Sequence, residues 1–207
     1  TLEIREGGIE YLRVTDNGWG IPKGEVPKAF LRHATSKIES ENDLQSIATL
    51  GFRGEALASI ASVSKLTMVT RTQDGEAGFH YVLEGGELKD EGPVGCPVGT
   101  SITVEDLFFN TPARRKFLKK PSAESTAVCD LAQRLILSHQ EVAFRVVVAG
   151  KTLYQSYGDG TLKNAIYVVY GKQVFASLME VEAQQAGMRV EGYVGRSEEH
   201  TSELQSH

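Results

Sequence analysis

Cysteine is scarce in this sequence, and its scarcity excludes proteins that are built on cysteine pairs or clusters. The two cysteines, Cys96 and Cys129, lie far apart and outside any C-x-x-C pattern. A disulfide framework needs more pairs, and a structural zinc site needs closely spaced ligands, so we expect neither. We interpret both as reduced thiols, buried or half-buried.

Long apolar runs are also missing. No stretch of about 18 consecutive apolar residues occurs, which is the length that favours a membrane-spanning helix. The first residues do not have the pattern of a secretory signal. We therefore expect no membrane contact and a cytoplasmic location, or a nuclear one if the source is eukaryotic.

An excess of positive charge is absent too. Lys and Arg number 22 against 27 Asp and Glu, which gives a net charge of −5. The overall charge gives no reason to expect nucleic-acid binding, and any such binding needs a local basic patch. A chain of 207 residues with 41% hydrophobic and 24% charged residues fits a globular protein of one large domain or one and a half.

The first motif that is present is DNGWGIP, Asp16 to Pro22. The alternating run before it, residues 9–15, predicts a strand, so Asp16 stands at a strand end. A carboxylate there can accept hydrogen bonds from an exocyclic amine. Gly18 and Gly20 remove the Cβ atoms that would keep the backbone away from a flat ring. The pattern by itself is also found in plain turns.

Two further motifs predict an anion site. In LRHATSKI, the hydroxyls and ammonium of Thr35, Ser36 and Lys37 indicate phosphate ligands, although alone they would fit a solvated helix end. GFRGEAL leads into an apolar run that predicts a helix, whose free N–H groups and positive dipole end favour an anion. The residues that we assign to cofactor binding in this motif are Gly51, Phe52, Arg53, Gly54, Glu55, Ala56 and Leu57. Residues 39–50, between the two motifs, are predicted to form a mobile lid.

A basic run follows later in the chain. Asn110-Thr111-Pro112 predicts a helix start, with Thr111 as the cap and Pro112 at the first position. The five cations after it are Arg114, Arg115, Lys116, Lys119 and Lys120. They fit a solvated helical face, a patch that contacts DNA phosphates, or an anchor for the lid, and the sequence leaves all three open.

The order and spacing of these motifs resemble the Bergerat-type (GHKL) ATPases, the superfamily of gyrase, the large ATP-dependent heat-shock chaperones, histidine kinases and the MutL mismatch-repair proteins. HATSKI, GFRGEAL and NTPARRKFL together are similar specifically to MutL, over residues 1 to 195. The resemblance implies that Asp16 holds the adenine amine of ATP and that Gly99-Thr100, otherwise an ordinary strand entry, closes the back of the pocket. It also implies Mg²⁺, weak non-specific DNA binding, and a mismatch-recognition partner. ATP would close the lid and drive dimerisation of this region, with a second copy or a homologous chain, and couple mismatch recognition to downstream repair.

The ends of the chain carry expectations of their own. Thr1 starts within a strand pattern, so we expect the chain to be truncated upstream. The family's water-activating Glu and Mg²⁺-binding Asn, which precede that strand, would then be missing, as would a lysine of the second domain. We expect the fragment to be inactive although its parent is an ATPase. A nucleotide-binding module that hydrolyses nothing, or another ATPase or kinase of the superfamily, are the alternatives.

The predicted fold class is α/β (an α+β sandwich): a Bergerat-type ATPase domain with a mixed, largely antiparallel sheet and helices on one face, plus the start of a second small α/β domain. We place the ATP-binding domain at residues 1–158 and the second domain at 161–195. Residues 196–207 resemble a translated sequencing adapter and are expected to be an artefact. Periodicity predicts one helix over 23–33, an irregular segment at 88–94, a helix at 162–170 and a strand at 174–181.

Overall fold

The structure is a computed structural model that describes residues 1–31 and 55–196. By its internal contacts the chain divides into two units. Unit 1 is Thr1–Asp130 with Val146–Leu153, and unit 2 is Leu131–Arg145 with Tyr154–His207. The division falls inside one helix, α3 (Pro121–Ser138). The domain limits predicted from the sequence stay a prediction. None of the helices in the described ranges has the length and apolarity that crossing a bilayer requires.

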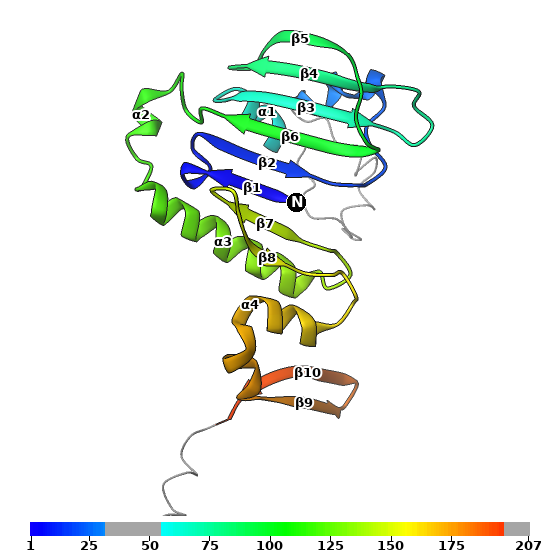
Figure 1. The fold of residues 1–207 in the computed structure, drawn as a ribbon, viewed down its shortest axis with the longest axis vertical. Coiled ribbons are helices and arrows are strands. Elements are labelled where there is room, and N and C mark those ends of the chain that lie inside the picture. Colours follow the sequence, from blue (N-terminus) through cyan, green and yellow to red (C-terminus); the bar gives the residue numbers. More distant parts are fainter. Residues whose placement is uncertain (32–54, 197–207) are drawn as a thin grey trace, which may run out of the picture. The chain divides into compact units, whose positions relative to one another are not determined.

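An eight-stranded mixed sheet is the main element of the fold (Figure 1), with the strand order β5-β4-β3-β6-β2-β1-β7-β8. The strands are β1 (Leu2–Arg5), β2 (Tyr11–Thr15), β3 (Lys65–Arg71), β4 (Gly78–Glu84), β5 (Glu87–Val94), β6 (Gly99–Glu105), β7 (Arg145–Val148) and β8 (Lys151–Gln155). Strand β1 pairs with β7 in parallel, whereas the pairs β1–β2, β2–β6, β6–β3, β3–β4 and β4–β5 are antiparallel. The mixed, largely antiparallel sheet predicted from the sequence is confirmed.

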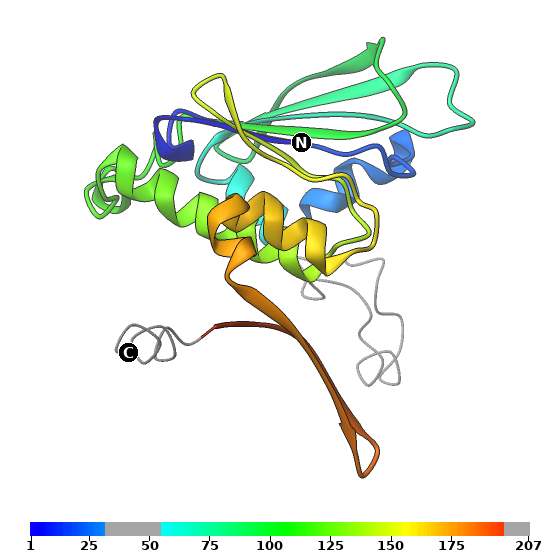
Figure 2. The same ribbon diagram turned by 60° about the horizontal axis from the view of Figure 1, so that its bottom comes forward.

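The core of unit 1 lies on one face of this sheet. Alternation in β3 sends Leu66, Met68 and Thr70 to that face, where each is at most 1% exposed. Three short helical segments, η2 (Lys23–Glu25), η3 (Pro27–Phe30) and α1 (Ala56–Ala61), lie on the same side (Figure 2). The buried cluster consists of Val26, Ala61, Leu66, Met68, Phe79, Tyr81, Leu83 and Val104. Helices on one face of the sheet are therefore confirmed for this unit.

Two segments of unit 1 differ from the periodicity prediction. The helix expected over 23–33 is, in its described part, two 3₁₀ turns, η2 and η3. Pro27 opens the second turn, and because proline has no N–H it cannot continue an α-helical ladder through this point. The segment expected to be irregular, 88–94, lies within β5, the edge strand beyond β4. Its side chains are mostly exposed, so backbone pairing and not apolar alternation makes it a strand.

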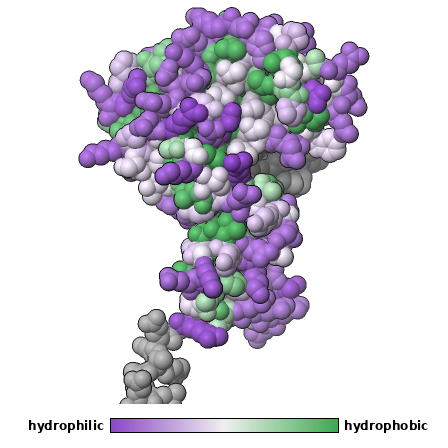
Figure 3. Space-filling model, in the orientation of Figure 1, coloured by the Kyte–Doolittle hydropathy of each residue, from purple (hydrophilic) through white to green (hydrophobic). Residues whose placement is uncertain are grey.

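Unit 2 joins a helix to a hairpin. Helix α4 (Leu162–Ala176) is followed by β9 (Leu178–Gln185) and β10 (Met188–Gly195), which pair antiparallel around a two-residue turn. The strand predicted at 174–181 is wrong in its first residues, which belong to α4. The backbone of α4 is broken at Gly171 (φ +76°), and after this break the Phe175 ring packs against Tyr167 and Tyr193, with centroids 5.8 and 6.4 Å apart. On the face seen in Figure 3, hydrophilic residues separate the apolar ones into small groups.

Candidate functional site

The loop that follows β2 is organised by one oxygen of Asp16. Its Oδ1 accepts hydrogen bonds from Gly18 N at 2.8 Å and Thr100 N at 3.2 Å. The backbone N–H of Asp16 donates to Thr100 O at 2.9 Å. No hydrogen bond from any described residue reaches Asp16 Oδ2. Because Asp16 is exposed, this second oxygen is open to a donor from outside the protein.

Two glycines allow backbone segments to meet beside Asp16. Gly20 has φ +72°, and a Cβ there would lie 2.1 Å from Arg71 O. Gly99 has φ +117°, and a Cβ there would lie 2.3 Å from Asp16 O. Neither position can hold a side chain without moving main-chain atoms. Because Gly20 has no side chain, the end of β3 can pack directly against it. Because Gly99 has none, the backbone of the Asp16 loop can do the same there.

Thr70 is a residue of this site that sequence reasoning missed. Its Oγ1 accepts a hydrogen bond from Ile21 N at 2.8 Å, and lies 3.1 Å from Gly99 O and 3.0 Å from Thr100 Oγ1. It thus joins the end of the loop to the start of β6. A signal was present: a hydroxyl stands at an inward position of β3, where the alternation places Leu66 and Met68.

The predicted phosphate ligands are placed only in part. Thr35, Ser36, Lys37, Gly51, Phe52, Arg53 and Gly54 lie outside the described residues. Glu55 immediately precedes α1, and Ala56 and Leu57 begin it. Leu57 packs against the same core cluster as Ile21, so the start of α1 and the end of the Asp16 loop rest on one core.

Most of the basic segment, residues 111–120, is exposed. It contains α2 (Pro112–Arg115), with Pro112 at a first-turn position as predicted. Thr111 stands at the N-cap position of α2, as predicted, but its hydroxyl is buried without a hydrogen-bond partner and the expected capping bond is not formed. At φ −130° and ψ 71° its backbone is turned from the extended conformation usual at this position, so the hydroxyl does not reach the first N–H groups. The five cations, Arg114, Arg115, Lys116, Lys119 and Lys120, are all exposed, and none forms an ion pair within the described part of the chain.

The loop before the basic segment is fastened to the end of α1. Asn110 Nδ2 donates to Ser62 O at 2.9 Å, and Phe108 N donates to Val63 O at 2.7 Å. Lys65 Nζ lies 2.9 Å from the Asp106 carboxylate, and this hydrogen bond raises the pKa of Lys65. These bonds hold the residues just before the basic segment in place, while the cations of the segment stay exposed to solvent.

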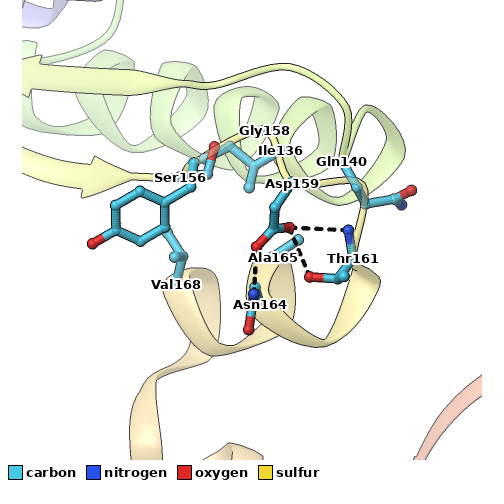
Figure 4. A pocket seen from close by; sticks show the side chains of 10 residues that line it. Ile136, Gln140, Ser156, Gly158, Asp159, Thr161, Asn164, Ala165 and Val168 are labelled. Carbon is cyan, nitrogen blue, oxygen red and sulfur yellow. Dashed lines mark hydrogen bonds between the residues drawn. The ribbon is translucent and has the colours of Figure 1, made fainter.

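A small pocket in unit 2 lies at the start of α4 (Figure 4). Its main polar group is the Asp159 carboxylate, which accepts hydrogen bonds from Thr161 N at 3.0 Å and Thr161 Oγ1 at 2.7 Å, and from Asn164 Nδ2. Hydrogen bonds from Thr161 and Asn164 hold the pKa of Asp159 below its usual value. Since Thr161 immediately precedes α4 and Asn164 lies in its first turn, the carboxylate ties the chain to the start of the helix, and we interpret the pocket as structural.

Within 1–31 and 55–196, no group of three or more His, Cys, Asp or Glu side chains is placed to hold a metal ion. Cys96 and Cys129 are free and half-buried, and burial raises the pKa of the Cys129 thiol.

Curated proteins of known name resemble the chain over nearly all of its length. It is 48% identical over 195 residues to the DNA mismatch repair protein MutL of Pelotomaculum thermopropionicum, covering 94% of this chain and 32% of the relative. The MutL of Streptococcus sanguinis is 46% identical over 198 residues, with 96% and 31% covered. Among solved structures, the Aquifex aeolicus MutL ATPase domain complexed with ADP matches with a TM-score of 0.73 and 30% identity, covering 95% of this chain and 68% of that one.

The chain belongs to the MutL family. It spans about a third of the length of the curated MutL relatives it matches. The likeness to MutL ATPase domains also confirms the Bergerat-type fold predicted from the sequence. No protein-family model matches the chain.

Proposed function

We propose that this MutL-family chain binds ATP and that the Asp16 loop is the adenine pocket. The observation that carries the proposal is the difference between the two carboxylate oxygens of Asp16. Oδ1 is occupied by two backbone N–H groups, while Oδ2 receives no hydrogen bond from the described residues. An ionised carboxylate oxygen only accepts hydrogen bonds, so it fits the amine of adenine and not the carbonyl of guanine. The ADP named for the Aquifex aeolicus domain supports a nucleotide as the ligand.

The remaining parts of the proposed site combine the geometry around Asp16 with the sequence motifs. Gly18, Gly20, Gly99 and Thr100 shape the base pocket beside Asp16. The phosphates are assigned to Thr35, Ser36, Lys37 and the motif from Gly51 to Leu57, whose last two residues begin α1. Mg²⁺ belongs to the proposal as a charge partner of the phosphates, but no described residue is assigned to it. A bound Mg²⁺ would neutralise phosphate charge.

For a full-length protein that contains this chain, we propose ATP hydrolysis and ATP-gated dimerisation, which couple mismatch recognition by a partner protein to downstream repair. MutL membership and the similarity to ATPase domains support this role. A nucleotide-gated module without hydrolysis stays the second candidate. Since the chain belongs to the MutL family, we do not propose a kinase or chaperone function.

Replacing Asp16 by Asn tests the adenine assignment. The Asn carbonyl can still accept from Gly18 N and Thr100 N, but an NH₂ donor takes the place of Oδ2 and opposes the adenine amine. In a full-length protein that contains the chain, ATP affinity should fall roughly 10- to 100-fold, the loss of one charged hydrogen bond, while GTP affinity changes little. Titration calorimetry with both nucleotides measures the two constants.

Asp74 provides the matched control. It is an exposed carboxylate in the turn after β3, and no hydrogen bond joins it to the described residues of the Asp16 loop. Asp74→Asn should leave both affinities unchanged. An equal loss of ATP and GTP affinity in Asp16→Asn would count against the adenine role, because it would indicate a general collapse of the loop.

We also propose that the basic segment contacts DNA phosphates. The supporting observation is that its five cations are exposed and have no ion-pair partners among the described residues, whereas Lys89 on β5 is paired with Glu87 at 2.8 Å. Unpaired surface cations are free to replace the counterions of a nucleic acid.

Charge reversal at Arg114 and Arg115 tests this contact. The double replacement by Glu should weaken duplex binding and reduce the slope of log affinity against log salt by about 0.9 for each phosphate contact removed. Fluorescence anisotropy across a salt series measures the slope, and Lys89→Glu serves as the control that should not change it. If the slope is unchanged while the fold is intact, these cations serve structure instead.

A further inference from the structure

Thr70 lies where the segments of the proposed adenine pocket cross. It is the last inward residue of β3 and is 1% exposed. Its Oγ1 contacts Ile21 N at 2.8 Å, Gly99 O at 3.1 Å and Thr100 Oγ1 at 3.0 Å. Each of these contacts is a hydrogen bond only if one of its two atoms supplies a hydrogen.

Only one assignment of hydrogens satisfies all three contacts. Ile21 N–H supplies its own hydrogen to Thr70. A carbonyl carries no hydrogen, so the contact with Gly99 O takes the single hydroxyl hydrogen of Thr70. The contact with Thr100 must then use the hydroxyl hydrogen of Thr100. Thr100 Oγ1 is left with lone pairs only.

We infer that Thr70 is a positioning and specificity-determining residue that fixes Thr100 as a hydrogen-bond acceptor. The inference rests on the proposed function, because it takes Gly99 and Thr100 as the back of the base pocket. The acceptor of Thr100 adds to the open Oδ2 of Asp16, whose Oδ1 is bound by Thr100 N. Among the described residues, Asp16 Oδ2 and Thr100 Oγ1 would then both offer an acceptor at this edge, which matches the amine of adenine and opposes the carbonyl oxygen of guanine.

Thr70→Val is the change that separates this role from packing. Valine keeps the branched shape but has no hydroxyl, so Thr100 can turn its hydrogen toward the base, and Ile21 N–H loses its acceptor. In a full-length protein that contains the chain, we expect ATP affinity to fall about tenfold with GTP affinity nearly unchanged, so that the ATP-to-GTP ratio falls about tenfold. Titration calorimetry with both nucleotides gives the ratio, and thermal unfolding is followed in parallel.

Two matched variants accompany it. Thr70→Ser keeps the hydroxyl and should keep the ratio within about twofold of wild type. Thr67→Val lies on the same strand at a position that alternation turns to the opposite face, and should leave the ratio unchanged. Thr100→Val provides a second route if Thr70→Val does not fold. It leaves the Thr70 bonds to Ile21 and Gly99 intact and should lower the ratio as well.

The outcomes are distinct. A fall in the ratio with Thr70→Val and its retention with Thr70→Ser support the inference. An unchanged ratio in Thr70→Val overturns it, and so does an equal loss of both affinities together with a lower unfolding temperature, which indicates packing alone. Where Thr70→Val does not fold, an unchanged ratio in Thr100→Val overturns it. A wild-type protein that binds neither nucleotide refutes the proposed function itself, and the inference falls with it.

Discussion

Alanine in place of Gly99 should remove measurable nucleotide binding. The backbone there has φ +117°, where an L side chain is strained, and the added Cβ would lie 2.3 Å from Asp16 O and 2.9 Å from the Cα of Asn17. The Asp16 segment must move, and with it the carboxylate that is proposed to select adenine. We expect ATP affinity to fall by more than about 100-fold, beyond the loss from any single hydrogen bond.

Gly95→Ala is the matched control for this change. It lies four residues earlier in the chain, its φ is not in the left-handed region, and a Cβ there would meet no atom within 4 Å. Calorimetric titration of ATP should show wild-type affinity for Gly95→Ala. If Gly99→Ala bound ATP as tightly as wild type, Asp16 would not depend on its contact with β6, and the proposed pocket would be wrong.

Leu66→Ala should cause the largest loss of stability among single changes in unit 1. Leu66 is fully buried in the middle of the core cluster, between the sheet and the helical segments that cover it. Truncation removes apolar contacts and leaves a cavity that close-packed neighbours fill only in part. A loss of about 2–5 kcal/mol in the free energy of unfolding is expected, a large share of the stability of a typical domain.

Denaturant unfolding followed by circular dichroism measures that loss. Leu88→Ala, on the edge strand β5, is the control, because Leu88 is 47% exposed and makes few core contacts. Its cost should be well under that of Leu66→Ala. Equal costs for the two changes would show that the cluster around β3 is not the centre of the core.

The sequence contained enough to locate the loop but not to assemble the site. The alternating run before Asp16 identified a strand end, and the glycines marked close backbone approach. What the glycines approach could not be known, because Arg71 lies beside Gly20 only through the pairing of strands that are distant in the chain. Thr70 was missed for the same reason: its partners, Ile21 and Thr100, are 49 and 30 residues away.

Local patterns also failed where neighbours decide the structure. Residues 88–94 have no clean apolar alternation, yet pairing with β4 makes them part of a strand. Val174 and Phe175 have the branched and aromatic side chains that favour strands, but in the structure both belong to α4, where the Phe175 ring packs against Tyr167 and Tyr193. The periodicity of apolar residues indicates which face of a segment is buried. It does not report the neighbouring elements against which these two segments pack.

Strand β5 also has features that oppose association between molecules. It forms one outer edge of the sheet and carries the carboxylates of Glu87, Asp90 and Glu91 beside the Lys89 ammonium. A strand from another molecule that added here would have to strip water from these charges. Edge-to-edge aggregation through this side of the sheet is therefore disfavoured by the charges that the strand itself carries.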